Sequence, residues 1–168
     1  MADETTAERY DWCPEGRWLH LVDAENLCGT GNPTDHDMRK VHAAYVDRLR
    51  PGPFDHMIVG ASHHSGFVAG HGWPGAKLVF GSGPDGADLA LLNALWPVDE
   101  MVQRFDGVVI ASGDHIFTDL VVDLTGAGGT VAVAWGKGAL SSRLESEARV
   151  ALPLFATSTA IDDHELVA

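Results

Sequence analysis

Short, almost uninterrupted apolar runs recur along this chain of 168 residues. A strand with one solvated face alternates apolar and polar residues, whereas a strand covered on both faces is apolar throughout. Each run has the length of a strand rather than a helix. The runs predict buried strands of a parallel sheet at Trp18–Val22, Met57–Ala61, Lys77–Phe80, Val108–Ala111 and Val131–Trp135, with a weaker candidate at Leu152–Phe155.

Helical patterns lie between the predicted strands. The clearest begins at Thr34 or Asp35, either of which can cap a helix, and ends at Leu49 because Pro51 cannot continue it. Near the C-terminus, Ser142 and Glu145 have the spacing of a capping box. Further helices are expected at Gly86–Trp96, at Phe117–Thr125 and from Ser141 or Ser142 to Arg149.

Strands and helices thus alternate through most of the chain. This order predicts a three-layer α/β fold, in which a central, mainly parallel sheet has helices on both faces. Hydrophobic residues make up 45% and charged residues 21%, which is an ordinary globular balance. We expect one domain over residues 17–156, between flexible tails at 1–16 and 157–168.

The formal net charge of −13 restricts the partners of this chain. Proteins that track along nucleic acid neutralise phosphates with Lys and Arg, so an acidic protein must confine its cations to one face or bridge the repulsion with a metal. No run approaches the roughly 18 apolar residues of a membrane span, and the N-terminus does not resemble a secretory signal. We therefore expect a cytoplasmic protein without a membrane partner.

Acidic residues follow three of the predicted strands. Asp23 follows the first strand, Asp88 lies in the first turn of the helix after the third, and Asp114 follows the fourth. Carboxyl ends of parallel strands share one edge of the sheet, so these residues converge if the strands are neighbours. Clustered carboxylates repel one another unless a cation lies between them, and oxygen ligands suit Mg²⁺ or Mn²⁺. Singly, each aspartate is equally compatible with a turn residue or a helix N-cap.

The segments that carry these aspartates resemble the NYN domain family, a branch of the PIN-like nucleases. The family pattern opens with a strand that ends in Asp-x-x-Asn, continues with an Asp that opens a helix, and has Ser-Gly-Asp-x-Asp-Phe after a later strand. The likeness covers about residues 18–155, and its matching segments are LVDAENL (21–27), GADLALLNAL (86–95) and VVIASGDHIFTDLVVDLTGAGGTVAV (108–133).

The resemblance implies a PIN-like fold and metal-dependent ribonuclease activity on single-stranded RNA. It implies that Asp23, Asp88 and Asp114 are catalytic residues that bind Mg²⁺ or Mn²⁺. Asn26 is implied to support the site or to contact the scissile phosphate. Ser112, which opens the Ser-Gly-Asp block, is expected to bind substrate.

One position departs from the family pattern. Ile116 stands where the family has the second Asp of the Ser-Gly-Asp-x-Asp-Phe block, and an isoleucine can neither bind a metal nor position water. Asp119, Asp85 or Glu25 can replace that carboxylate. The open alternative is a catalytically silent binding module whose acidic surface docks a protein partner or a second copy of itself, as a homodimer.

Cations near the predicted site are few. Lys137 and Arg143 follow the fifth strand and are the candidates for holding a substrate phosphate, with ordinary solvated charges as the alternative reading. The net charge also leaves open a phosphohydrolase that acts on a small substrate, because a small anion need not track along the surface.

Two further signals are weaker. Gly81–Gly86 matches GxGxxG, but Pro84 lacks an N–H to cradle phosphate, so we expect a turn that brings Asp88 to the site. The histidines at 63, 64 and 71 lack a metal-ligand spacing. They predict a substrate-facing loop, in which Trp73 stacks on a base.

Overall fold

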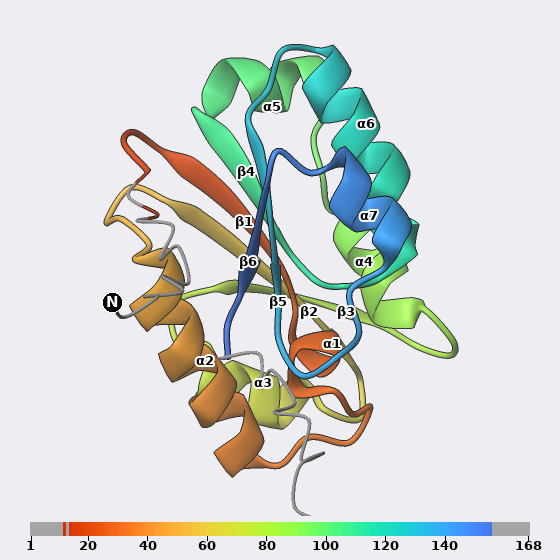
Figure 1. Cartoon of the computed structure of the whole chain (residues 1–168). Helices are drawn as coiled ribbons and strands as arrows, with labels where there is room; N and C mark the ends of the chain where they lie inside the picture. The colour runs from red at the N-terminus through yellow and green to blue at the C-terminus, as the bar shows by residue number, and fades with distance from the viewer. Residues whose placement is uncertain (1–11, 13, 156–168) are drawn as a thin grey trace, which may run out of the picture.

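The computed structural model describes residue 12 and residues 14–155 of the chain. Their strands are β1 (Trp18–Asp23), β2 (His56–Ser62), β3 (Lys77–Gly81), β4 (Gly107–Ala111), β5 (Val131–Trp135) and β6 (Val150–Pro153). They form one sheet in the order β3-β2-β1-β4-β5-β6, and every neighbouring pair is parallel (Figure 1). The predicted three-layer α/β fold with a parallel central sheet is confirmed.

The weakest predicted strand is displaced along the chain. The prediction was Leu152–Phe155, but β6 begins two residues earlier, where Val150 pairs with Ala132 of β5. Only Leu152 and Leu154 of this segment are fully buried, so its apolar pattern is too sparse to define where pairing begins.

The helices include three short ones that the sequence patterns did not reveal. Thr34 caps α2, and it forms a capping box with Asp37. At the other end of the chain, Ser141 caps α7, so the capping box predicted for Ser142 and Glu145 is wrong. The bounds are α1 (Ala24–Cys28), α2 (Asp35–Leu49), α3 (Gly66–Gly72), α4 (Gly86–Asn93), α5 (Val98–Arg104), the 3-10 turn η1 (His115–Phe117), α6 (Thr118–Gly126) and α7 (Ser142–Glu147).

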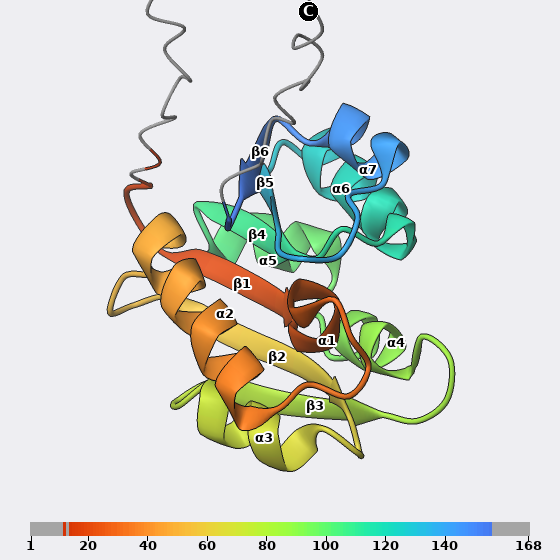
Figure 2. The same cartoon turned by 60° about the horizontal axis from the view of Figure 1, so that its bottom comes forward.

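Helices cover both faces of the sheet (Figures 1 and 2). On one face, α2 and α3 pack over alternate strand residues such as Val22 and Val59. On the other, α4, α5, α6 and α7 cover the intervening residues, such as Leu21 and Ile110. The alternation of strand side chains between two covered faces explains why the strand sequences are apolar throughout.

One polar cluster is buried within the first of these faces. His20 is fully buried, with its Nδ1 2.7 Å from the Tyr45 hydroxyl and its Nε2 3.0 Å from Asp55. Burial lowers the pKa of His20, so the ring is neutral at pH 7, donating from Nε2 to Asp55 and accepting at Nδ1 from Tyr45. Asp55 also accepts from the backbone N–H groups of Trp18 and Gly52. The cluster ties β1, α2 and the start of β2 together.

The folded part extends N-terminal to residue 17. Trp12 packs edge-to-face on Trp18, with 5.0 Å between the ring centroids. The remaining residues of the predicted tails, 1–11, 13 and 157–168, lie outside the described residues. None of the described helices has the length and apolar character needed to cross a bilayer.

Candidate active site

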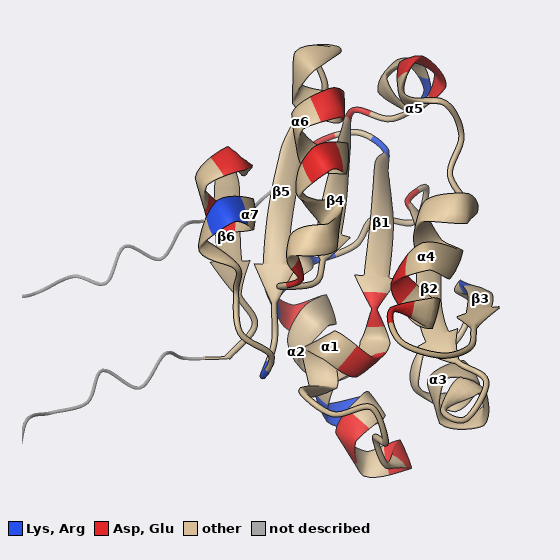
Figure 3. Ribbon diagram, turned by 90° about the vertical axis from the view of Figure 1, so that its right-hand side faces the viewer, with Lys and Arg blue, Asp and Glu red and all other residues tan. Residues whose placement is uncertain are grey.

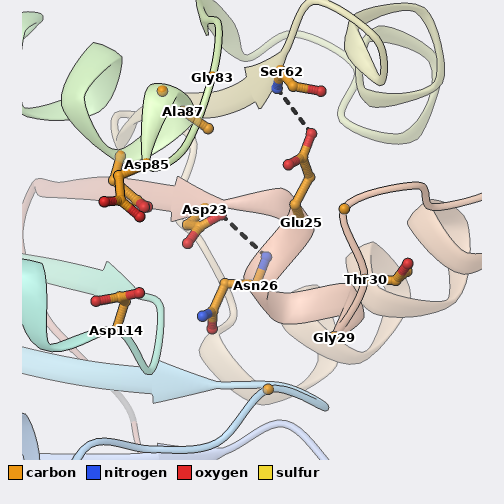
Figure 4. A pocket seen from close by; sticks show the side chains of 14 residues that line it. Asp23, Glu25, Asn26, Gly29, Thr30, Ser62, Gly83, Asp85, Ala87 and Asp114 are labelled. Carbon is orange, nitrogen blue, oxygen red and sulfur yellow. Dashed lines mark hydrogen bonds between the residues drawn. The ribbon is translucent and has the colours of Figure 1, made fainter.

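The candidate site lies where the strand order reverses. The chain leaves β1 toward the face covered by α2, whereas it leaves β4 toward the face covered by α6, so a crevice opens between the two carboxyl ends. A cavity of about 410 Å³ occupies this place (Figure 4). Five carboxylates line it, and none of the described residues that line it is Lys or Arg; the acids are Asp23, Glu25, Asp85, Asp88 and Asp114. Figure 3 shows this acidic edge in red, where β1 ends and α4 begins.

Asp23 is the last residue of β1 and is 5% exposed. One carboxylate oxygen caps α1 by accepting the N–H of Asn26 at 3.1 Å, and the other accepts the Ser112 hydroxyl at 3.0 Å. Because Ser112 follows β4, these bonds join the ends of the two central strands. They also fix the direction in which the carboxylate of Asp23 points.

Asp88 reaches the site because two glycines let α4 start against the edge of the sheet. The backbones of Gly81 and Gly86 touch, and a Cβ at Gly81 would collide with the carbonyl of Gly86. Further along, a Cβ at Gly60 would lie 2.6 Å from Leu91 Cγ, so α4 also lies close over β2. The GxGxxG segment is therefore the turn that delivers Asp88, as predicted, and not a phosphate loop.

Asp88 is 8% exposed, and its carboxyl group forms a hydrogen bond with Asp23. Burial raises the pKa of Asp88 to about 8, and the negative charges of Asp23, Asp114 and Asp85 add to the shift. Burial also raises the pKa of Asp23, against the hydrogen bonds that Asp23 accepts. At neutral pH the Asp23–Asp88 pair therefore holds one proton, which the two carboxyl groups share. Asp88 Oδ1 is buried and has no partner among the described residues.

Asp114 approaches the same space from β4. Its Oδ1 accepts the N–H of Ile116 at 2.9 Å, which caps η1, and lies 3.0 Å from Nδ1 of His115. The side chain is 30% exposed and faces the cavity beside Asp23 and Asp85 (Figure 4). Three segments far apart in the sequence thus bring Asp23, Asp88 and Asp114 to one cavity, as the positions of the strand ends predicted.

Asn26 and Ser112 have positioning roles here. Asn26 Oδ1 accepts the N–H of Gly113 at 2.9 Å, which braces the loop after β4 against α1. Ser112 is fully buried and bonded to Asp23 and to the N–H of Asp114. The prediction that Ser112 contacts substrate is therefore wrong, because its hydroxyl is not accessible.

Two of the three acids proposed to replace the missing family carboxylate line the cavity. Asp85 is exposed at its mouth, and Glu25 accepts hydrogen bonds from the N–H of Ser62 at 2.9 Å and from the hydroxyl of Ser65. Asp119 has an 89% exposed side chain that pairs with Arg143, and it lines a different groove. Sequence order alone could not distinguish these three residues.

The two predicted phosphate-holding cations are placed differently. Lys137 lies at the rim, where a Cβ on the cavity-lining Gly29 would come within 2.9 Å of Lys137 Cβ. Its Nζ is 3.7 Å from Asp37. Arg143 on α7 pairs with Asp119 at 3.6 Å and is not among the residues that line the cavity. Of the two, only Lys137 is near enough to meet a ligand there.

The loop after β2 departs from its prediction in one respect. Trp73 is buried, 1% exposed, and packs against Tyr45, so it cannot stack on a base. His63, His64 and His71 are exposed as expected.

Comparison with protein-family models, with curated proteins and with solved structures finds no match for this chain. The strand order is one that doubly wound sheets share, some of which bind dinucleotides at the same crevice. In those proteins a glycine-rich turn follows the first strand, whereas β1 here ends in Asp23. The chemistry of the site therefore depends on its own residues and not on its strand order.

The donors of the site fit a hard divalent cation. Within the described part of the chain, no three His, Cys, Asp or Glu side chains are already grouped so as to hold a metal ion. Asp23 and Asp88 share a proton, and Asp114 Oδ1 caps η1, so these oxygens are engaged elsewhere. The buried, unpaired Oδ1 of Asp88 and the oxygen-only donor set nevertheless suit Mg²⁺ or Mn²⁺, which would displace the proton.

Proposed function

We propose that this chain is a metal-dependent ribonuclease of the NYN type. Asp23, Asp88 and Asp114 are its metal ligands and catalytic residues, with Mg²⁺ or Mn²⁺ as the cofactor. The observation that carries the proposal is the convergence of these carboxylates from β1, α4 and β4 in one acidic cavity, with a buried oxygen of Asp88 left unpaired. A buried carboxyl oxygen without a partner is costly, and a bound cation would supply that partner.

The chain's own residues have defined tasks in this mechanism. A bound divalent cation supplies Lewis acidity and an activated water near neutral pH. Ser112 and the N–H of Asn26 orient Asp23, so its carboxylate is already positioned before a cation binds. Asp88 gives up its proton on loading. Asn26 uses Oδ1 to brace Gly113, which leaves its Nδ2 as the donor for a substrate phosphate.

The net charge of −13 is consistent with this reading only if the cofactor offsets the repulsion of RNA. No Lys or Arg belongs to the described lining of the cavity, and Lys137 at the rim is already close to Asp37. Binding of RNA is therefore proposed to depend on the divalent cation. We further place the protein in the cytoplasm.

The direct test is cleavage of a labelled single-stranded RNA in the presence of Mn²⁺. Asp114→Asn and Asp88→Asn should each reduce the rate by more than about 100-fold, because each removes a charged ligand. Asp119→Asn is the matched control, since that carboxylate is exposed on α6 away from the cavity. Equal rates for wild type and Asp114→Asn would rule out the mechanism.

A second candidate is hydrolysis of small phosphate esters, favoured over RNA by the net charge of −13, because a small anion need not track along the acidic surface. Activity on small esters with none on RNA would select this candidate. Absence of both activities, together with absence of Mn²⁺ binding, would select the silent binding module, in which Ile116 replaces a needed carboxylate. Light scattering would then show whether that module forms a homodimer.

A further inference from the structure

Exposed aromatic side chains lie beside the acidic cavity. Phe67 on α3 is 76% exposed, and Phe80 near the end of the edge strand β3 is 43% exposed. Helix α3 packs along β3 on the face that Phe80 occupies (Figure 2). An exposed aromatic side chain close to the rim of a cavity is a candidate contact for a ligand in that cavity.

Histidines pair with both rings. His63 lies 5.9 Å from Phe80 between ring centroids, and His71 lies 4.4 Å from Phe67. We name these four residues, His63, Phe67, His71 and Phe80, the aromatic surface. Gly66 lets the Phe80 ring lie against the start of α3, because a Cβ at Gly66 would come within 2.8 Å of Phe80 Cε1.

The aromatic surface begins at the rim of the cavity. Ser62 and Gly83 line the cavity. Their chain neighbours, His63 and Ser82, are hydrogen-bonded to each other, with 2.8 Å between His63 Nδ1 and the Ser82 hydroxyl. This bond joins the loops after β2 and β3. A ligand that leaves the acidic cavity over Ser62 therefore meets His63 and Phe80 next.

We propose that the aromatic surface stacks the unpaired bases of single-stranded RNA beside the scissile phosphate. This inference rests on the proposed ribonuclease function and defines its substrate as unpaired. Aromatic rings bind bases through their faces without adding positive charge, which suits a chain of net charge −13 whose cavity lining holds no Lys or Arg. The bases of a duplex are stacked on one another and cannot use these rings.

The test is binding of a fluorescein-labelled eight-nucleotide oligoadenylate, read by fluorescence anisotropy with Ca²⁺ in place of Mn²⁺, because Ca²⁺ takes oxygen ligands and keeps a cation in the site. Gel analysis checks that the oligomer stays intact. The double substitution Phe67→Ala with Phe80→Leu should weaken binding at least about fivefold. Leucine keeps apolar bulk over Gly66, and thermal melting checks that the variant folds. Phe54→Ala is the matched control, because Phe54 is 78% exposed but precedes β2 at the opposite end of the sheet.

An oligomer of the same length with abasic riboses separates stacking from phosphate contacts. Wild type should bind it at least about fivefold more weakly than oligoadenylate, and the double substitution should not weaken it further. Equal binding of oligoadenylate by wild type and the double variant would overturn the inference. Equal binding of the abasic and normal oligomers by wild type would do the same.

Cleavage in Mn²⁺ distinguishes failure of this inference from failure of the ribonuclease proposal. In the double variant, KM for RNA should rise while kcat at saturating RNA stays near that of wild type. Loss of cleavage in Asp114→Asn, together with an unchanged KM for RNA in the double variant, would contradict the stacking inference alone. Binding of oligoadenylate that depends on Phe67 and Phe80, without any metal-dependent cleavage, would contradict the ribonuclease proposal alone.

Discussion

Asp88 is a buried carboxyl group with other carboxyl groups around it. It is buried against Asp23, and the charges of Asp114 and Asp85 lie nearby, so its carboxyl group keeps a proton to about pH 8. Acquiring a divalent cation would exchange that proton for two positive charges. The affinity of the site for metal should therefore rise with pH until Asp88 is ionised.

The raised pKa of Asp88 predicts how stability depends on pH. Between its ordinary pKa of 3.8 and about 8, the folded protein binds a proton that the unfolded chain does not. The stabilisation is thus complete below about pH 4 and is lost as the pH rises through 8. Asp88→Asn should remove this loss and be more stable than wild type at pH 8.5 by about 2 kcal/mol.

Urea unfolding in EDTA at pH 5.5, 7.0 and 8.5 measures this difference. Asp119→Asn is the control, because the side chain of Asp119 is 89% exposed and lines a different groove. A constant difference between wild type and Asp88→Asn across these pH values would contradict the assigned proton.

The cluster around His20 gives a second prediction at this scale. Tyr45→Phe removes the hydroxyl that donates to His20 Nδ1 and leaves a buried acceptor without a partner. The expected loss of unfolding free energy is about 1–3 kcal/mol. Val46→Ala, at an exposed site on the same helix, should cost much less. Denaturant unfolding of both variants checks the comparison, and similar losses would show that the hydroxyl contributes little.

At the scale of elements, the sequence patterns predicted the strands that are covered on both faces and missed the short helices. Val131–Trp135 was predicted with its observed bounds because its residues are apolar and covered on both faces. Helix α3 was not predicted, since three glycines in its seven residues hide any helical pattern. Helix α4 ends at Asn93 rather than Trp96, because the N–H groups of Ala94 and Leu95 bond to Leu91 and Leu92 in a tighter 3-10 turn.

The capping box of α2 gives a prediction about the stability of this one helix. Thr34 accepts the N–H of Asp37 at 3.2 Å, and Asp37 accepts the N–H of Thr34 at 3.0 Å. Thr34→Ala should reduce the free energy of unfolding by about 1 kcal/mol, whereas Thr34→Ser keeps the hydroxyl and should be close to neutral. Urea titration of both variants decides, and equal losses would assign the effect to the methyl group rather than the cap.

The contact of β3 with the start of α4 gives the prediction that links an element to the site. In Gly81→Ala the new Cβ would collide with the carbonyl of Gly86, so α4 and Asp88 should move away from the cavity. We expect at least about tenfold weaker Mn²⁺ binding and a loss of stability. Gly31→Ala is the control, since Gly31 lines the cavity and has nothing within 4 Å of a Cβ. Unchanged Mn²⁺ affinity in Gly81→Ala, measured by calorimetry, would contradict this role.

At the scale of the whole molecule, strand order determines which residues meet. The sequence placed Asp23 and Asp114 at strand ends, but only the pairing of β1 with β4 makes those ends neighbours. Asp88 joins them through α4, which crosses back from the sheet edge. The place of Arg143, which pairs with Asp119 outside the cavity lining, likewise depends on the long-range packing of α7 over the face that α6 covers.

The acidic net charge of the protein is compatible with the proposed RNA substrate once a bound cation is included. A protein of net charge −13 with five carboxylates around one cavity repels RNA unless metal is bound. Substrate binding, ionisation of Asp88 and cation binding are therefore linked in one equilibrium. A single measurement can follow the cation binding and the proton release together.

That measurement is isothermal titration calorimetry of the chain with Mn²⁺ at pH 7, in two buffers of different ionisation enthalpy. Wild type should bind one ion per chain and release close to one proton, because Asp88 is protonated beforehand and ionised afterwards. Asp88→Asn and Asp114→Asn should each lose at least about tenfold in affinity, and Asp88→Asn should release no proton. Absence of Mn²⁺ binding by wild type, or binding that is unchanged in both variants, would contradict the account.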